Sequence, residues 1–277
     1  MQLRAYLRQY EARRDVSSAY VRQLDSAIVG FGKFIGREPN VDDLVPATVN
    51  THLRSMRDAG RSDCYRRQRL VNLCVLWNAA ADDGLIPYPS RRALIRIKVG
   101  DTDGRTLRIE EVRGLIATAT QLDGRYSHGI GRSGYWCSYL RAAWDTGLRG
   151  CDLRRLTVDT LRERVFAVVQ VKTRKRLRRA MRQSTIDAIA ATLPPSRQLA
   201  WPLWASLEMF RREARDLFKA AGISGSLKNL RSACGTNVEL NNPGRGHDVL
   251  GNTRKIFESH YFDATQDESE PLMPEEL

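Results

Sequence analysis

The sequence is poor in the features that mark secreted, membrane and metal-dependent proteins. No run of 18 apolar residues occurs, and the first stretch, MQLRAYLRQYEARR, lacks the apolar segment of a signal peptide. The chain has five cysteines, which stand singly and form no CxxC pair: Cys64, Cys74, Cys137, Cys151 and Cys234. A disulfide framework or zinc site is therefore not expected. We expect a soluble, intracellular protein with reduced core cysteines and without metal or cofactor.

Acidic residues are also scarce relative to basic ones. The 277 residues include 45 Lys and Arg against 32 Asp and Glu, a formal net charge of +13. Six of the acidic residues fall in the tail 262–277, which holds no base, so the rest of the chain is still more basic. This balance predicts a polyanionic partner, although a solvated arginine-rich surface is the plainer alternative.

Strand signals are almost missing from the first hundred residues. Apolar residues recur at helical spacing in SSAYVRQLDSAIVGFGKFIG, in PATVNTHLRSMRDAG and in SDCYRRQRLVNLCVLWNAAADDG. Ser17 or Ser18 is expected to cap the first of these helices, and Pro46 fits the first turn of the second. The third carries three bases near its start, which we expect to contact DNA: Arg66, Arg67 and Arg69. Residues 1–90 are thus predicted to form a helical, DNA-clamping domain.

Proline and glycine then interrupt the helical pattern, and a second domain follows. The stretch GLIPYPSRRALIRIKVGDTDGR predicts a linker at 91–104, with a catalytic domain at 105–277 that ends in the acidic tail 262–277. Most of this domain reads as helices. The one clear strand pattern is RVFAVVQVK, which the basic stretch RKRLRRAM follows after a short turn. The predicted fold class is therefore mainly α with a small β-hairpin (α+β).

The tip of this hairpin is unusually basic. It carries six bases in eight residues: Lys172, Arg174, Lys175, Arg176, Arg178 and Arg179. Charges on an edge strand discourage aggregation, but six exceed what that purpose requires. A basic two-stranded ribbon can lie in a DNA groove, and we expect Arg174, Lys175 and Arg176 to contact DNA.

Four other residues are candidates for chemistry, although each has an ordinary explanation by itself. Arg149, in DTGLRGCDLRRL, stands at a predicted helix start, where its planar fork suits phosphate oxygens, but an ion pair with Asp152 is the common alternative. Lys228 and Arg231 lie one turn apart on one helix face, which a surface helix also allows. Tyr261, in LGNTRKIFESHYF, fits a buried aromatic as well as a nucleophile.

In their order along the chain these motifs resemble the tyrosine recombinase family, also called the phage integrase family. TGLR..DL at Arg149, Lys172 in a hairpin, K..LR at Arg231, and LGN followed by Tyr261 at the family's spacing all match. RTLRIEEVRGLI is similar to the segment that opens the family's catalytic domain, and the N-terminal helices resemble its core-binding domain. The resemblance covers nearly the whole chain.

The resemblance implies a mechanism and a set of roles. Tyr261 would attack a backbone phosphorus and leave a 3′-phosphotyrosyl link, Arg149 and Arg231 would hold the non-bridging oxygens, and Lys172 would protonate the departing 5′-oxygen. Neither metal nor ATP is required. The implied partner is double-stranded DNA, bound by a homo-oligomer that is a dimer on each site and a tetramer at synapsis, in the cytoplasm at the nucleoid.

Two positions depart from the family pattern. Lys228 stands where the family usually has histidine, and Asn252 where it has histidine or tryptophan. Lysine resembles the related type IB topoisomerases, and a charged lysine cannot act as a base. Asn252 can donate a hydrogen bond but carries no charge. Two alternatives to a recombinase therefore stay open, a type IB topoisomerase-like enzyme and an architectural or regulatory relative that binds DNA without efficient cleavage.

Overall fold

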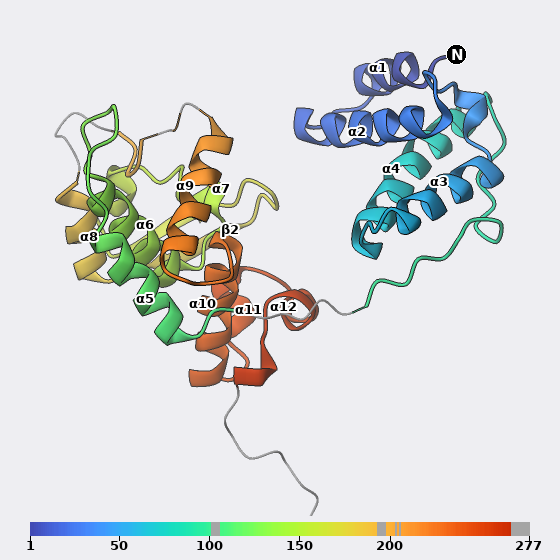
Figure 1. Ribbon diagram of the computed structural model, residues 1–277. Helices are drawn as coiled ribbons and strands as arrows, with labels where there is room; N and C mark the ends of the chain where they lie inside the picture. The colour runs from blue at the N-terminus through green and yellow to red at the C-terminus, as the bar shows by residue number, and fades with distance from the viewer. Residues whose placement is uncertain (101–105, 193–197, 203, 205, 267–277) are drawn as a thin grey trace, which may run out of the picture. The chain divides into compact units, whose positions relative to one another are not determined.

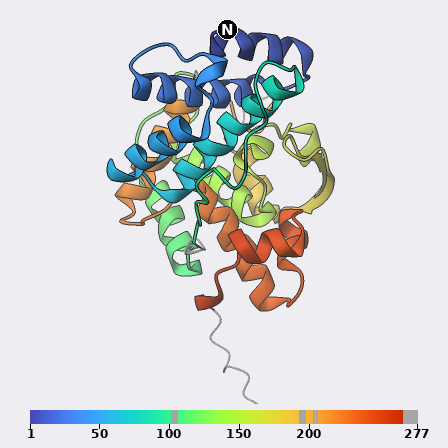
Figure 2. The same ribbon diagram turned by 90° about the vertical axis from the view of Figure 1, so that its right-hand side faces the viewer.

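The chain folds as two compact units, Met1–Gly100 and Asp101–Leu277. The computed structural model describes residues 1–100, 106–192, 198–202, 204 and 206–266 (Figures 1 and 2). The division falls within the stretch 91–104 that the sequence predicts to be a linker, whose last four residues lie outside the described ones. Most of the predicted acidic tail, residues 267–277, also lies outside them.

The first unit consists of helices joined by short loops. Its elements, drawn blue to cyan in Figure 1, are α1 (Leu3–Arg13), α2 (Ser18–Ile35), η1 (Val41–Asp43), α3 (Pro46–Asp58) and α4 (Asp63–Asp82). Ser17 caps α2 by accepting a hydrogen bond from the amide of Tyr20, as the sequence predicts. Pro46 occupies the first turn of α3, where its missing N–H costs nothing.

One of the bases assigned to DNA contact belongs to the core of this unit instead. Arg66 is only 6% exposed, and its Nε donates to the carbonyl of Leu53 at 3.0 Å. Its Nη1 pairs with Asp63. The guanidinium joins α3 to α4 and is not available to a ligand, so the prediction for Arg66 is wrong. Arg67 is exposed and Arg69 half-buried.

The second unit holds the remaining elements. They are α5 (Ile109–Thr120), α6 (Arg132–Thr146), α7 (Gly150–Leu153), η2 (Asp159–Leu161), β1 (Val165–Val169), β2 (Arg176–Ala180), α8 (Gln183–Ala190), α9 (Leu207–Ala220), α10 (Leu227–Asn241), α11 (Gly246–Leu250), α12 (Arg254–His260) and η3 (Ala264–Gln266). Helix α6 is central, because it packs against α5, α8 and α10 and buries Trp136, Tyr139 and Leu140 completely or nearly so. The fold is mainly α, which confirms the predicted class.

Strands β1 and β2 form the predicted antiparallel hairpin, with Val165 opposite Ala180 and Val169 opposite Arg176. Alternate residues of β2 face inward, so Leu177 is half-buried and Arg179 is buried. Arg179, one of the six bases counted at the tip, is therefore not available at its surface. Arg174 adopts φ 56° in the turn, and its amide donates to the carbonyl of Gln170 at 2.9 Å, closing the tip.

Two expectations from composition can be compared with the described residues. All five cysteines are unpaired, but Cys64 is exposed, so the assignment of every cysteine to the core is wrong for that residue. A membrane-spanning segment is not found among the helices of the described residues, which are too short or too polar to form one.

Candidate active site

The turn between α6 and α7 fixes the first candidate residue. Gly147 ends α6 with φ 57°, a conformation that favours glycine, and a Cβ there would lie 2.9 Å from Leu250. Arg149 follows as the N-cap residue of α7. Its side chain does not pair with Asp152, whose Oδ1 instead accepts the amide of Val171 at 2.7 Å. The ordinary explanation of Arg149 therefore does not apply.

Four of the predicted residues meet at one pocket. Arg149 from the start of α7, Lys228 and Arg231 from α10, and Tyr261 at the end of α12 all line a cavity of about 410 Å³. Nothing in their sequence separation requires this, since Arg149 and Tyr261 stand more than a hundred positions apart. The cavity brings three of the predicted cations and one phenol together.

Arg231 is the most deeply placed of these cations. It is 4% exposed, and its guanidinium donates to two backbone carbonyls, that of Gly147 and that of Leu250 at 2.7 Å. Burial and the neighbouring charge of Arg149 lower the pKa of Arg231 from its usual range. The carbonyls hold the guanidinium rigidly, in line with a site organised before any ligand arrives.

Asn252 connects the two arginines. Its Oδ1 accepts Nη2 of Arg149 at 3.1 Å and lies 3.5 Å from Nη2 of Arg231. Three buried donors of this group have no hydrogen-bond partner in the described part of the chain: Nη1 of Arg149, Nε of Arg231 and Nδ2 of Asn252. Buried donors without partners are costly, and an anion bound at this group would supply acceptors for such donors.

Tyr261 is held beside Arg231. The guanidinium carbon of Arg231 lies 5.3 Å from the centre of the tyrosine ring. Burial by itself raises the pKa of Tyr261, but the charge and hydrogen bonding of Arg231 and the charges of Arg149 and Lys228 outweigh it and lower the pKa below the ordinary 10. A lowered pKa favours the phenolate, which is the nucleophilic form.

The backbone around Tyr261 is also fixed. The hydroxyl of Thr236, fully buried on α10, donates to the carbonyl of Tyr261 at 3.1 Å and accepts the amide of Asp263 at 3.2 Å. The carboxylate of Asp263 in turn accepts the amide of Thr106 at 3.0 Å. The chain on both sides of the tyrosine is therefore tied to the body of the unit.

Lys172 lies outside this pocket, in the exposed turn of the hairpin. The root of the hairpin is nevertheless attached to the site, because Asp152 holds the amide of Val171 and the buried Gln170 reaches the carbonyl of Leu250 at 3.4 Å. Residues of the tip are exposed and form no ion pair within the described residues: Arg174, Lys175 and Arg176.

Three further arginines lie at or near the pocket, and the sequence patterns did not predict that they belong to the site. Arg154 and Arg211 line the pocket, and Arg154 lies over the ring of Phe210 with its guanidinium carbon 5.2 Å from the ring centre. Arg179 is buried in β2, where burial and the charge of Arg231 lower its pKa to about 10. The alternation in β2, which puts Arg179 on the same face as Leu177, was the available signal for it.

No group of three or more His, Cys, Asp or Glu side chains that could hold a metal ion occurs among the described residues. The chemistry available to this pocket is that of fixed positive charge, hydrogen-bond donors and a phenol.

Comparisons with known proteins identify the architecture. No family model matches the sequence, and no curated protein matches it either. Solved structures do match. A lambda integrase (75–356) dimer bound to a COC′ core site aligns over 99% of this chain and 100% of its own, with a TM-score of 0.74 and 15% identity. Tn1549 transposon integrase (82–397), in complex with circular intermediate DNA, aligns over 98% and 100%, with a TM-score of 0.67 and 13% identity.

XerH site-specific recombinase, bound to a palindromic difH substrate after cleavage, aligns over 90% of this chain and 76% of its own, with a TM-score of 0.69 and 11% identity. The chain therefore has the fold of the tyrosine recombinases, which confirms at the level of fold the resemblance noted in the sequence. At these identities the comparisons show the fold alone, so the activity has to be argued from the pocket.

Proposed function

We propose that the protein is a site-specific tyrosine recombinase that cuts and rejoins duplex DNA through a 3′-phosphotyrosyl intermediate. The observation that carries the proposal is the pocket itself, in which Arg149, Arg231 and Lys228 surround Tyr261 and lower its pKa. The unpartnered donors of Arg149, Arg231 and Asn252 supply what a phosphodiester needs. A tyrosine that merely packed in the core would need none of these.

In the proposed reaction the phenolic oxygen of Tyr261 forms a bond to a backbone phosphorus while the bond from phosphorus to the 5′-oxygen breaks. The phenolic proton passes to solvent, and the leaving 5′-oxygen takes a proton from Lys172 on the hairpin turn. Attack by another 5′-hydroxyl reverses the step. The bond energy is kept in the phosphotyrosyl ester, so no ATP is consumed.

The arginines act on the phosphate rather than on the nucleophile alone. Negative charge grows on the non-bridging oxygens as the pentavalent transition state forms, and Arg149 and Arg231 meet it from fixed positions. Asn252 holds both guanidinium groups through its Oδ1 and has its Nδ2 free for a phosphate oxygen. Asn252 thereby takes over the positioning and hydrogen bonding of the histidine or tryptophan that the family usually has at this position, but it carries no charge.

The proposed substrate is double-stranded DNA, contacted by the hairpin tip and by the bases of the first unit that reach solvent, Arg67 and Arg69. Among the matching structures is a lambda integrase tetramer bound to a Holliday junction. By analogy we propose a dimer on each site and a tetramer at synapsis, acting at the nucleoid.

Covalent trapping tests the proposal. Nicked suicide duplexes, tiled from the DNA that flanks the gene, would be incubated with wild type and with Tyr261→Phe and run on denaturing gels. We expect a shifted adduct with the wild type only. Tight binding by both proteins without any adduct would favour the DNA-binding relative that no longer cuts.

A second assay needs no knowledge of the target site. Reversible cleavage at any sequence lets one strand swivel, so supercoiled plasmid would be incubated with each protein in the presence of a chelator and without ATP. Fast relaxation that depends on Tyr261, without exchange between two DNA molecules, would favour the topoisomerase-like alternative that Lys228 keeps open. No relaxation together with a trapped adduct fits a site-specific recombinase.

A further inference from the structure

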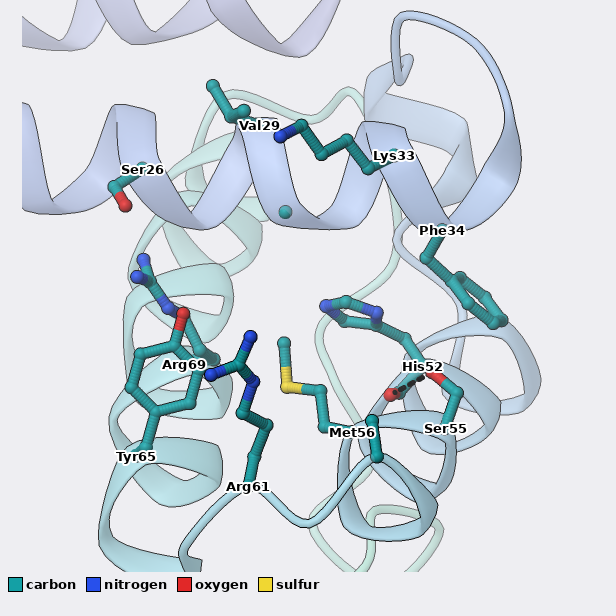
Figure 3. A pocket seen from close by; sticks show the side chains of 12 residues that line it. Ser26, Val29, Lys33, Phe34, His52, Ser55, Met56, Arg61, Tyr65 and Arg69 are labelled. Atoms are coloured by element: carbon teal, nitrogen blue, oxygen red, sulfur yellow. Dashed lines mark hydrogen bonds between the residues drawn. The ribbon is translucent and has the colours of Figure 1, made fainter.

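The first unit contains a second basic pocket, distinct from the candidate active site. Helices α2, α3 and α4 line an open cavity of about 440 Å³, a size within the range of small-molecule sites. Figure 3 shows the side chains that line it, which come from these three helices and from the turn that joins α3 to α4. The cavity has no part in the chemical step proposed above, although Arg69, which lines it, is also one of the bases proposed to contact DNA.

The charge of this pocket has one sign. Lys33 on α2, Arg61 in the turn and Arg69 on α4 line it, and no carboxylate does. Within the described residues none of these three cations forms an ion pair. Cations placed together without a counter-charge repel one another, and an anion between them removes that repulsion.

His52 gives an independent indication of a ligand. Its side chain is 2% exposed, yet neither ring nitrogen has a hydrogen-bond partner. In Figure 3 one of these nitrogens faces the cavity from α3. Phe31 and Phe34 pack against the ring, with centroids at 5.4 and 5.0 Å. Aromatic packing explains why the ring is buried, but not why both of its polar atoms lack partners, a state that is costly for a buried group.

The state of this histidine is set by its surroundings. Burial, and to a smaller extent the charge of Arg69, lower the pKa of His52 to about 4. The ring is therefore neutral at pH 7 and offers one donor and one acceptor. It adds no further charge to the pocket, but it can hydrogen-bond a polar group of a ligand.

The remaining wall is aromatic and apolar. The ring of Tyr65 is 41% exposed, and the guanidinium carbons of Arg69 and Arg61 lie 4.6 and 6.0 Å from its centre. Phe34 and Met56 also line the pocket. Guanidinium planes and aromatic rings are the groups on which unpaired bases stack, and arginine also binds phosphate through its planar fork.

We propose that this pocket binds the phosphate of an unpaired nucleotide, with Lys33, Arg61 and Arg69 on the phosphate, the base against the apolar wall, and His52 hydrogen-bonded to the ligand. Two sources have this chemistry, a free mononucleotide and an unpaired nucleotide of a DNA strand. Both are distinct from the scissile phosphodiester at Tyr261, so the inference does not depend on the cleavage reaction.

Calorimetric titration of the full chain at low salt tests the proposal. The probes are deoxyadenosine monophosphate, deoxyadenosine without phosphate, and a short single-stranded oligodeoxyadenylate. Two variants remove the site: Arg69→Ala deletes a cation, and Gly30→Leu fills the cavity, since a Cβ at Gly30 meets nothing within 4 Å. Arg54→Ala is the matched control, an exposed arginine on α3 that does not line the pocket.

We expect the mononucleotide to bind the wild type and Arg54→Ala equally and to bind both site variants at least tenfold more weakly. Deoxyadenosine should bind at least tenfold more weakly than its monophosphate. If the oligonucleotide binds more tightly than the mononucleotide and loses this binding in the same variants, the source of the ligand is a DNA strand. If the oligonucleotide binds equally or more weakly, the source is a free nucleotide. Absence of mononucleotide binding to the wild type, or equal binding by Arg69→Ala and Gly30→Leu, would overturn the proposal.

Discussion

Strand β2 carries two kinds of arginine within four residues. Arg176 is exposed at the tip, whereas Arg179 is 9% exposed and lies against the surroundings of Arg231. An exposed cation contributes to DNA affinity mainly by displacing counterions from DNA, a contribution that salt weakens. A buried cation contributes to the chemical step through its fixed position and through an electric field that salt hardly screens. The two groups should therefore separate in experiment, tip cations controlling affinity and buried arginines controlling the chemical step.

The largest effect is expected for Arg231→Lys. The variant keeps the charge, but lysine lacks the rigid planar fork whose separate nitrogens hold the carbonyls of Gly147 and Leu250 while Nε stays available to a phosphate oxygen. Loss of one such donor typically costs about 10²–10³ in rate, and we expect a fall of that order in adduct formation at saturating DNA. The control is Arg211→Lys, an exposed arginine lining the same pocket. Equal rates for both variants would mean that geometry at Arg231 does not matter.

Removing the charges of the hairpin tip should weaken DNA binding and leave the rate of the chemical step nearly unchanged. In the triple variant Arg174→Ala, Lys175→Ala, Arg176→Ala, we expect the slope of log affinity against log salt to flatten by up to about 2.7, since each contacted phosphate contributes about 0.9. The rate of adduct formation at saturating DNA should stay within about twofold. Fluorescence anisotropy over a salt series measures the first quantity, and single-turnover trapping the second. A large loss of rate with an unchanged slope would reverse the assignment.

Arg179→Met sharpens the comparison within one strand. Removing this cation abolishes the cost of burying it, which its lowered pKa of about 10 reflects, but it also removes a hydrogen bond to the carbonyl of Asp248. These effects oppose one another, so we expect the free energy of unfolding in urea to change by less than about 1 kcal/mol.

Catalysis by Arg179→Met should fall more than stability does. The buried charge adds to the field at Arg231, and we expect adduct formation roughly tenfold slower, which corresponds to about 1.4 kcal/mol. Arg178→Met, exposed on the same strand, should leave the rate unchanged. A variant that unfolds easily but cleaves normally when folded would show that Arg179 has a structural role only.

Features set by local sequence could be predicted, whereas contacts between distant parts of the chain could not. Helical periodicity and end signals located α2, α3 and α4 of the first unit and most helices of the second, because those signals are local, but α1 was not predicted. Motif order singled out four of the residues that line the pocket, namely Arg149, Lys228, Arg231 and Tyr261. The five-residue helix α11 shows no periodic pattern and was not predicted. The partners of Arg231 were not predictable either, since Gly147 lies 84 positions away and only tertiary packing brings its carbonyl to the guanidinium.

Burial of individual polar residues was the weakest point of the sequence-based predictions. Arg66 looked like an exposed base, but the carbonyl of Leu53 and the carboxylate of Asp63 draw it into the core. His52 gave no signal, because its environment depends on three helices meeting. Charge in a sequence therefore locates a functional surface only roughly, and the hydrogen-bond partners decide which cations are free to bind.

Lys228 shares features with both the exposed tip cations and the buried arginines, because it is exposed on α10 yet lines the pocket. The pH dependence of cleavage can show whether Lys228 acts on the nucleophile. Its charge favours the phenolate of Tyr261 and is one of the causes of the lowered pKa. In Lys228→Gln that pKa rises, so the rising limb of the pH–rate profile should move to higher pH. We expect a loss of a few fold at pH 7 that disappears well above the pKa, and no shift in Lys255→Gln, an exposed control on α12. A loss of equal size at every pH would mean that Lys228 acts on the phosphate and not on the nucleophile.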